Sequence, residues 1–340
     1  MTAVQDAIRV LVEGEELSGV AAAAAMEEIM TGGATPAQIG AFLATLRVRG
    51  ESPEVMAACL GVTERHAEPV VVENVIDIVG TGGDGADTFN VSTAAALVVA
   101  GAGVRVAKHG NRAASSKCGS ADVLEALGGK LDLTGAQAAA VVNGCGFCFL
   151  FAQQFHPAFR HVGGPRREMG TRTIFNVLGP LTNPARPRRM LVGVGARAMG
   201  PLVAEAFRMR GVERVMVVHS AEGLDEISPA GATSAWVVEG GTVSEREITP
   251  ATFGLGAHPL AAVVGGDAAQ NSGAMLAMLD GGDGPVTDFV VMNAAAGLWV
   301  SGKVESMGDG VELARQSIAS GRAREVLDRY VSLTQEFASE

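Results

Sequence analysis

Residues 76–125 read IDIVGTGGDGADTFNVSTAAALVVAGAGVRVAKHGNRAASSKCGSADVLE, and this stretch decides the fold. An apolar run over 76–79 ends at the glycine loop Gly80-Thr81-Gly82-Gly83-Asp84-Gly85, and a helix-compatible run over 91–100 follows. Glycines permit positive φ and let consecutive backbone amides approach an anion, while the start of the helix adds its positive dipole end. The order of strand, glycine loop and helix therefore predicts a phosphate site.

A second unit of the same kind follows directly. A predicted strand over 104–107 ends at the polar cluster KHGNR, residues 108–112, and serines follow at 115, 116 and 120. The glycine loop does not match the dinucleotide fingerprint, which needs a third glycine at the helix start and an acid about 20 residues later. The nucleoside triphosphate loop is excluded as well, because Ala86 and Asp87 follow the last glycine in place of lysine and a hydroxyl residue.

The chain before this stretch predicts a small helical domain over residues 1–68. Four helices are expected, over 3–12, 20–30, 36–47 and 53–66. Thr35-Pro36 and Ser52-Pro53 each place a capping hydroxyl before a proline at the first helical position, which is a helix start signal. A larger α/β domain is predicted over 69–340.

The larger domain alternates short apolar runs with helical patterns. Strands are expected over 76–79, 104–107, 147–151, 190–194 and 215–219, and this alternation predicts a mainly parallel sheet flanked by helices. Ligands of such sheets bind beyond the carboxyl ends of the strands. His156 and the segment 220–226 follow two further strands, so four polar loops are expected at one edge of the sheet.

Two other segments complete the predicted fold. Residues 156–184 interrupt the alternation and predict a helical excursion that closes over the edge of the sheet or returns to the helical domain, with hinges at Gly163-Gly164 and Gly179-Pro180. Helices over 289–302 and 311–337 are expected at the end of the chain.

Composition limits the classes of partner. Of the 340 residues 48% are hydrophobic and 19% charged, and the formal net charge of -11 argues against a general nucleic-acid or membrane binder. Residues 160–189 nevertheless hold seven arginines with Glu168 as the only acid, which indicates an anionic ligand. The early acids and the lack of a long apolar run predict a cytoplasmic protein with no signal peptide or membrane span. The four cysteines fit reduced thiols in that compartment.

The glycine loop together with KHGNR some two dozen residues later resembles the anthranilate phosphoribosyltransferases, and the likeness extends over nearly the whole chain. The resemblance implies transfer of the phosphoribosyl group of 5-phosphoribosyl 1-diphosphate (PRPP) to the amine of anthranilate, with release of pyrophosphate, in tryptophan biosynthesis. It also implies Mg²⁺ as cofactor, with two ions, and a homodimer formed through the helical domain. The alanine-rich helix over 21–30 agrees with such an interface.

The resemblance also implies which residues bind PRPP. Backbone amides of the glycine loop, the start of the following helix and the polar cluster after the second strand supply the donors. These residues are Gly80, Gly83, Asp84, Thr88, Asn90, Val91, Ser92, Thr93, Lys108, His109, Gly110, Asn111, Arg112, Ala113, Ala114, Ser115, Ser116 and Ser120. Lys108 and His109 are also candidates for a catalytic role, although an aromatic amine needs little help from a base before attack.

Metal and acceptor sites follow from the same resemblance. The expected metal ligands are the oxygens of Ser92, Asp225 and Glu226. The expected anthranilate contacts are Gly80, His109, Asn111, His156, Arg166 and Pro180. Arg166 would grip the carboxylate through two parallel hydrogen bonds, although Pro165 stands where the family commonly has an aliphatic residue. The alternatives are a structural role for Arg166, paired with Glu168 or with an acid at an interface, and a solvated loop pair for Asp225 and Glu226.

Other functions remain open at this point. A pyrimidine nucleoside phosphorylase-like enzyme, or a transferase for another aromatic amine, shares the expected fold. A non-catalytic relative that binds nucleic acid would have a basic surface and would have lost its metal carboxylates. The acidic chain with Asp225 and Glu226 in place has neither property.

Overall fold

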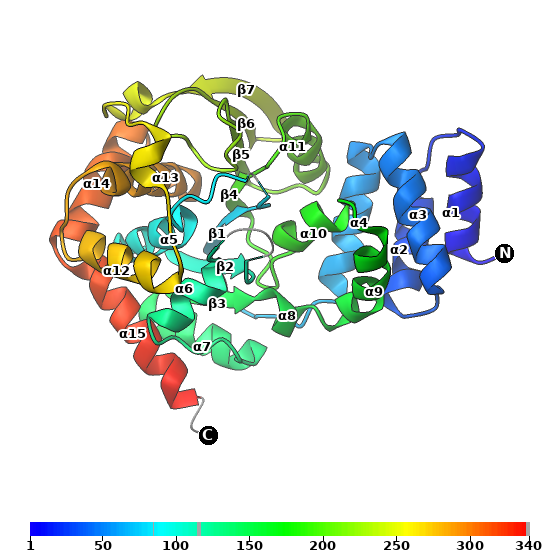
Figure 1. Cartoon of the computed structure of the whole chain (residues 1–340), viewed down its shortest axis with the longest axis horizontal. Helices are drawn as coiled ribbons and strands as arrows, with labels where there is room; N and C mark the ends of the chain where they lie inside the picture. The colour runs from blue at the N-terminus through cyan, green and yellow to red at the C-terminus, as the bar shows by residue number, and fades with distance from the viewer. Residues whose placement is uncertain (84, 114–116, 338–340) are drawn as a thin grey trace.

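The computed structural model describes residues 1–83, 85–113 and 117–337. The predicted PRPP contacts Asp84, Ala114, Ser115 and Ser116 lie outside the described residues. A helical bundle containing the N-terminus lies at one end of the molecule, and a sheet with helices on both faces forms the other end (Figure 1). The predicted fold class, a small helical domain with a larger, mainly parallel sheet domain, is confirmed.

The helical bundle follows the predicted start signals. Its helices are α1 (Ala3–Val12), α2 (Gly19–Met30), α3 (Pro36–Arg49) and α4 (Pro53–Arg65). A side-chain hydroxyl of Thr2, Ser18, Thr35 or Ser52 accepts a backbone N–H at each start, which satisfies amides that have no partner within the helix. All four predicted helices are confirmed.

The sheet has seven strands in the order β3-β2-β1-β4-β5-β6-β7. They are β1 (Val75–Gly80), β2 (Arg105–Gly110), β3 (Phe147–Phe151), β4 (Arg189–Gly193), β5 (Arg214–Ser220), β6 (Thr233–Glu239) and β7 (Thr242–Ile248). The five predicted strands are confirmed and pair in parallel. The sequence analysis missed the antiparallel pair β6–β7, although the two-residue turn Gly240-Gly241 is a hairpin signal.

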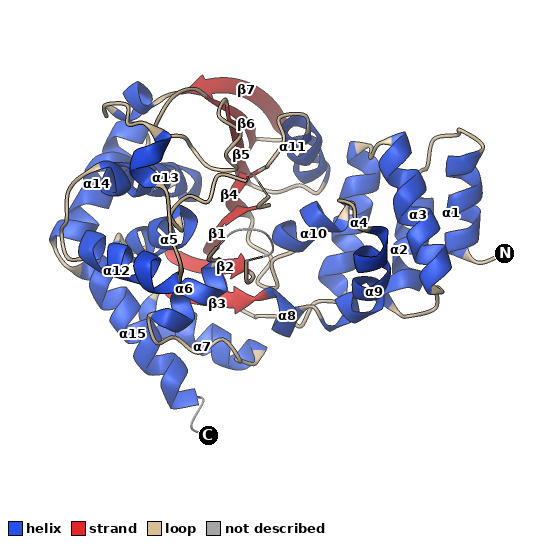
Figure 2. Cartoon of the chain, viewed as in Figure 1, coloured by secondary structure: helices blue, strands red, loops and turns tan. Residues whose placement is uncertain are grey.

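Helices cover both faces of the sheet (Figure 2). They are α5 (Val91–Gly101), α6 (Ser120–Ala126), α7 (Gly135–Cys145), α11 (Met199–Met209), α12 (Ala268–Leu279), α13 (Pro285–Ser301), α14 (Met307–Ala319) and α15 (Arg322–Phe337), with short 3-10 turns at Pro250–Phe253 and Leu260–Val263. Every residue of α5 is buried, because α13, α14 and α15 pack around it. The predicted helix over 311–337 is corrected to two helices, which separate near Gly321 at φ 74°. Among the described residues, no helix is both long enough and apolar enough to cross a membrane.

The excursion after β3 consists of α8 (Ala152–Phe155), a 3-10 turn (Pro157–Phe159), α9 (Arg160–Met169) and α10 (Phe175–Leu181). Val162, Phe175 and Leu178 are buried in one hydrophobic cluster with the N-terminal helices. The excursion therefore packs on the helical bundle. The predicted hinge positions are wrong, because Gly163-Gly164 lies inside α9 and Gly179-Pro180 inside α10. The helical conformation is interrupted between α9 and α10, where Gly170 has a φ of 60°.

Candidate active site

The glycine loop lies at the carboxyl end of β1 and is held by its neighbours. Thr81 N donates to Gly193 O at 2.9 Å, and Gly82 N donates to Asp225 Oδ2 at 2.6 Å. Gly82 and Gly83 have φ of 69° and 73°, which other residues adopt at a cost. Gly82 and Gly83 thus have the positive φ expected of them, at the carboxyl end of β1.

The carboxylates after β5 are packed closely against the ends of β1 and β4. A Cβ on Gly80 would lie 2.3 Å from Asp225 Oδ2, and one on Gly193 only 1.5 Å from Asp225 O. Asp225 is buried and Glu226 half-buried, so the solvated-loop alternative does not describe Asp225. Within the described residues no three His, Cys, Asp or Glu side chains form a metal cluster. A cation at this pair would therefore need further oxygen ligands, such as phosphate.

The start of α5, at Val91, follows the glycine loop in the chain and is suited to an anion. Within the described residues no side chain caps this helix, so its first-turn amides are not satisfied by a cap. Thr93 Oγ1 is buried there without a hydrogen-bond partner among the described residues. Asn90 has structural partners, because its Nδ2 donates to Cys118 O at 3.0 Å and its Oδ1 accepts from Asn271 Nδ2 at 2.8 Å. The first turn of α5, rather than the Asn90 side chain, thus offers the donors.

Lys108 occupies a different place from the one the sequence suggested. Lys108, His109 and Gly110 belong to β2 and not to the loop after it, which corrects the predicted end of this strand at residue 107. The Lys108 side chain is 1% exposed, and its Nζ donates to Ile78 O at 2.5 Å and to Ser92 Oγ at 3.2 Å. The lysine therefore ties β1, β2 and α5 together beneath the site.

Charges around Lys108 explain why a lysine is tolerated there. Burial lowers the pKa of Lys108, while the nearby carboxylates Asp77, Glu226 and Asp225 raise it. Burial also raises the pKa of Asp77 to about 6, against the opposing effects of Lys108 and a hydrogen bond from Asn183. The buried positive charge of Lys108 lowers the electrostatic cost of placing the carboxylates of Asp225 and Glu226 close together.

The loop after β2 is organised by acids. Asp122 Oδ2 accepts from Ala113 N at 3.1 Å and from Gly119 N at 2.8 Å, and this closes the loop at the start of α6. Arg112 pairs with Asp122 Oδ1 at 3.1 Å and with Glu125, whose hydrogen bonds raise the arginine pKa. Arg112, predicted to bind PRPP, is thus engaged by two carboxylates in this structure. Ser120 begins α6 at the edge of the same loop.

Two histidines meet between β2 and the excursion. The ring centroids of His109 and His156 lie 5.1 Å apart, and Phe159 stacks on His156 at 4.8 Å. Burial lowers the pKa of His156 to about 4 and that of His109 well below its usual 6.5. Nε2 of both rings is buried without a partner among the described residues, while His109 Nδ1 lies 3.5 Å from Pro180 O. Two neutral imidazoles therefore lie side by side, buried next to an aromatic ring.

Arg166 lies on α9 and is connected to the two histidines through the rings of Phe175 and Phe159. It donates weakly to Asn176 Oδ1 at 3.5 Å and stands 5.6 Å from the centroid of the Phe175 ring. Within the described residues no carboxylate pairs with it, so the alternative pair with Glu168 is absent there. Burial lowers its pKa, which indicates that the charge lacks compensation. Pro165 lies inside α9 without ending the helix.

Arg172 is a site residue that the sequence analysis missed. It stands between α9 and α10, and its guanidinium donates to Gly82 O at 3.0 Å and to Gly83 O at 3.4 Å. A Cβ on Gly83 would lie 1.9 Å from Arg172 Nη2. The concentration of arginines over 160–189 pointed to this segment, but no local pattern distinguished Arg172 from its neighbours.

Comparison with known proteins identifies the class first. Residues 5–67 match the model described as glycosyl transferase family, helical bundle domain, and residues 72–324 match the model described as glycosyl transferase family, a/b domain. The chain thus belongs to a glycosyl transferase family with a helical bundle domain and an α/β domain.

Similar proteins within this class of glycosyl transferases are anthranilate phosphoribosyltransferases. The chain is 50% identical to anthranilate phosphoribosyltransferase of Rhizobium meliloti (strain 1021), over 94% of this chain and 95% of that protein. The structure of anthranilate phosphoribosyltransferase from Thermus thermophilus has 43% identity and a TM-score of 0.92, with 98% of this chain and 100% of that chain covered. The enzyme from Saccharomyces cerevisiae, 28% identical with 98% of each chain covered, has been solved in complex with PRPP and Mg (TM-score 0.90) and with 4-fluoroanthranilate (TM-score 0.87). The chain therefore belongs to the anthranilate phosphoribosyltransferases, and it is an enzyme that transfers a phosphoribosyl group to anthranilate in tryptophan biosynthesis.

Proposed function

We propose that the edge of the sheet formed by the ends of β1, β2, β4 and β5 performs this transfer by stabilising the departing pyrophosphate. The bond between C1 and the pyrophosphate oxygen breaks, the anthranilate nitrogen bonds to C1, and that nitrogen then loses one proton. The ribose ring acquires positive charge as pyrophosphate leaves. Hydrogen-bond donors fixed around the leaving group therefore lower the activation barrier most. The hydrogen bond between Gly82 N and Asp225 Oδ2, which joins the glycine loop to the rim carboxylates, carries this proposal.

The PRPP site would be built mainly from backbone. The amide of Gly83 and the first turn of α5 are suited to the pyrophosphate, and the unpartnered Thr93 Oγ1 offers a further donor. The loop over 110–113 and Ser120 would bind the remaining phosphate. For Arg112 to take part, its pairing with Asp122 and Glu125 would have to weaken.

Mg²⁺ fits the oxygen donors at this rim. Ser92, Asp225 and Glu226 would hold two ions together with phosphate oxygens, because hard cations prefer oxygen ligands and these residues supply too few for a complete shell. Bound Mg²⁺ would neutralise charge on the pyrophosphate. Lys108 would keep the Ser92 hydroxyl in place, since its Nζ donates to that oxygen.

Anthranilate would bind beside His109 and His156, between β2 and the excursion that packs on the helical bundle. Arg166 would pair with its carboxylate, and Gly80, Asn111 and Pro180 would complete the pocket. The neutral rings of His109 and His156 can accept hydrogen bonds through Nε2, which suits the amine. The amine proton is lost after the new bond forms, and His109 is the candidate to receive it.

Arg172 would position the glycine loop. Its guanidinium engages the carbonyls of Gly82 and Gly83, and this orients the intervening peptide group. Because Arg172 lies between two helices packed on the helical bundle, it also links that bundle to the PRPP site. A change in the orientation of the helical bundle relative to the sheet domain would therefore alter the position of the glycine loop.

Purified protein with both substrates and Mg²⁺ tests the reaction. We expect a change in anthranilate fluorescence that depends on all three components and is lost in Asp225→Asn. The absence of any change in folded protein would reject the assignment. Phosphorolysis of thymidine or uridine is the parallel assay, and turnover there would favour the phosphorylase alternative.

We also propose a homodimer formed through the helical bundle. Val12, Val20 and Val48 are 68%, 82% and 85% exposed, and all three lie on the first three helices. Several exposed apolar side chains on neighbouring helices favour an interface. The alanines of α2 do not supply it, because Ala22 and Ala25 are buried within the bundle. Light scattering should give twice the chain mass, and Val48→Glu should lower it; a monomeric wild-type protein would contradict the proposal.

The proposal also includes the domain boundary and the cellular compartment. The domain boundary would lie near residue 68, which the separate matches over 5–67 and 72–324 support, with the excursion over 156–184 packed on the helical domain. The protein would work in the cytoplasm, where its four free cysteines would stay reduced. Thiol titration of freshly lysed cells tests the second point, and a disulfide in the native protein would count against it.

A further inference from the structure

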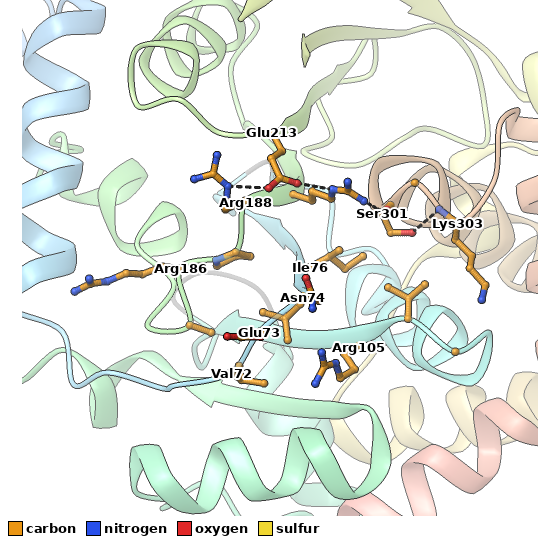
Figure 3. Close-up of a pocket in the computed structure, with 17 residues that line it drawn as sticks. Val72, Glu73, Asn74, Ile76, Arg105, Arg186, Arg188, Glu213, Ser301 and Lys303 are labelled. Atoms are coloured by element: carbon orange, nitrogen blue, oxygen red, sulfur yellow. Dashed lines mark hydrogen bonds and ion pairs between the residues drawn. The ribbon is translucent and has the colours of Figure 1, made fainter. Parts of the chain in front are cut away.

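A cavity of about 640 Å³ opens at the amino ends of β1, β2 and β4 (Figure 3). β1 begins here at Val75 and ends at Gly80, so a distance of about 17 Å, at roughly 3.3 Å per residue, separates the cavity from the glycine loop. Among the described residues that line the cavity, none is a proposed ligand of PRPP, metal or anthranilate. The cavity is thus distinct from the active site.

The lining is cationic in an acidic protein. Five basic and two acidic side chains line the cavity, namely Arg105, Arg186, Arg188, Arg189, Lys303, Glu73 and Glu213. The register places Arg105 opposite Val75 and Arg189 opposite Ile76, so these two arginines flank the start of β1 on its two sides. An excess of positive charge, gathered in one cavity of a chain with net charge -11, favours an anion.

Part of this charge is already compensated. Glu213 accepts from Arg188 Nε at 2.9 Å, drawn as a dashed line in Figure 3, and from Arg189 Nε at 3.0 Å. Arg189 also donates to Ser301 O. The carboxylate between the two arginines fixes their orientation while leaving one net positive charge on the upper wall of the cavity.

Arg105 and Lys303 are different. Arg105 donates to the neutral amide oxygen of Asn143 at 3.2 Å, and Lys303 Nζ lies 3.9 Å from the position that a Cβ on Gly103 would occupy. Within the described residues, no carboxylate pairs with either of them. Arg186 has no carboxylate partner among the described residues either, but its side chain points away from the cavity in Figure 3, and its Nη2 donates to the backbone oxygen of Glu64 at 3.0 Å. A ligand in the cavity could therefore engage Arg105 and Lys303 without first displacing an acid.

The floor and the rim also resemble a binding site. Val75, Ile76 and Ala185 are buried apolar residues that line the cavity. Two of the three non-glycine residues with positive φ among the described residues also line it, Asn74 at 51° and Arg186 at 48°. Such backbone costs free energy and gathers at functional sites. The volume lies within the range of small-molecule sites, about 300–1,000 Å³.

We propose that this cavity binds a small organic dianion, with its charged head between Arg105 and Lys303 and its body on the apolar floor. Phosphate monoesters and dicarboxylates share the required chemistry, because a guanidinium binds either group through two parallel hydrogen bonds and an ammonium adds a point charge. Arg189, held by Glu213, supplies the third side of the site.

Titration calorimetry with glycerol 3-phosphate and with malonate tests the proposal. The protein is first saturated with PRPP and Mg²⁺ without anthranilate, so that the active site is filled. We expect saturable binding of at least one probe with a Kd of about 1 mM, and the stronger probe identifies the head group. Binding should weaken at least tenfold in the double variant Arg105→Gln/Lys303→Gln.

A charge-matched control separates this site from general attraction. Lys130→Gln/Arg322→Gln removes two exposed positive charges that do not line the cavity, and it should bind the probes as the wild type does. Both variants should keep the wild-type KM for PRPP. The proposal would be overturned if the wild type and both double variants bound the probes equally well. It would also be overturned if neither glycerol 3-phosphate nor malonate reached saturation at roughly 20 mM.

Discussion

Arg172→Ala tests how the helical bundle controls the PRPP site. The substitution removes the hydrogen bonds from the guanidinium to Gly82 O at 3.0 Å and to Gly83 O at 3.4 Å. Hydrogen bonds from charged donors contribute about 1.5–3 kcal/mol each when well made. Arg172 is exposed and the second bond is long, so we expect a total near the low end, about 1.5 kcal/mol. If the loop must hold this orientation to bind pyrophosphate, the Kd for PRPP should rise about tenfold.

The assay is a calorimetric titration with PRPP and Mg²⁺, followed by steady-state kinetics with anthranilate. Arg167→Ala is the matched control, because Arg167 is an exposed arginine on α9 with no hydrogen bond or ion pair among the described residues. The KM for anthranilate should change little in either variant. A Kd for PRPP within twofold of the Arg167→Ala value, or an effect on anthranilate alone, would refute the positioning role.

Three further predictions follow from the site. Arg166→Lys should raise the KM for anthranilate at least tenfold and leave the Kd for PRPP unchanged, because a lysine cannot form two parallel bonds with a carboxylate; equal effects on both substrates would place Arg166 elsewhere. Gly193→Ala puts a methyl group 1.5 Å from Asp225 O, so Mg²⁺-dependent PRPP binding should fall by more than tenfold, whereas Gly163→Ala on α9, with open space around it, should bind normally; normal binding by Gly193→Ala would contradict the packing of the carboxylates. The pKa of His156 is lowered from 6.5 to about 4, so the unfolded chain takes up a proton first as pH falls, and stability is lost between pH 6.5 and 4. This loss is about 2 kcal/mol by pH 5, and urea unfolding of His156→Phe should lack that part of the pH dependence; identical pH profiles would exclude a buried neutral imidazole.

The sequence predicted the local features that glycine, proline and apolar runs encode. Caps such as Thr35 and Ser52 marked helices α3 and α4, and the five parallel strands appeared as buried apolar runs. The antiparallel pair β6–β7 escaped because β7 is largely exposed and lacks such a run. The hinges at Gly163-Gly164 and Gly179-Pro180 were misplaced because helix packing against the bundle overrides local preference.

Long-range contacts account for what the sequence could not show at the site. Lys108 reads as a loop residue, yet its burial depends on Ile78, Ser92 and the neighbouring carboxylates, which come from separate segments. The engagement of Arg112 by Glu125 and the contact of Arg172 with the glycine loop likewise arise only in the folded chain. Motifs identified segments that the fold brings to one edge of the sheet, while the tertiary contacts decide which side chains of those segments are buried and which partners they have.

A crystal structure with PRPP and Mg²⁺ bound tests the central proposal most directly. We expect the pyrophosphate oxygens within hydrogen-bond distance of the Gly83 amide and the first turn of α5, with metal density beside Asp225 and Glu226. Pyrophosphate bound away from the carboxyl ends of β1 and β5 would contradict the account.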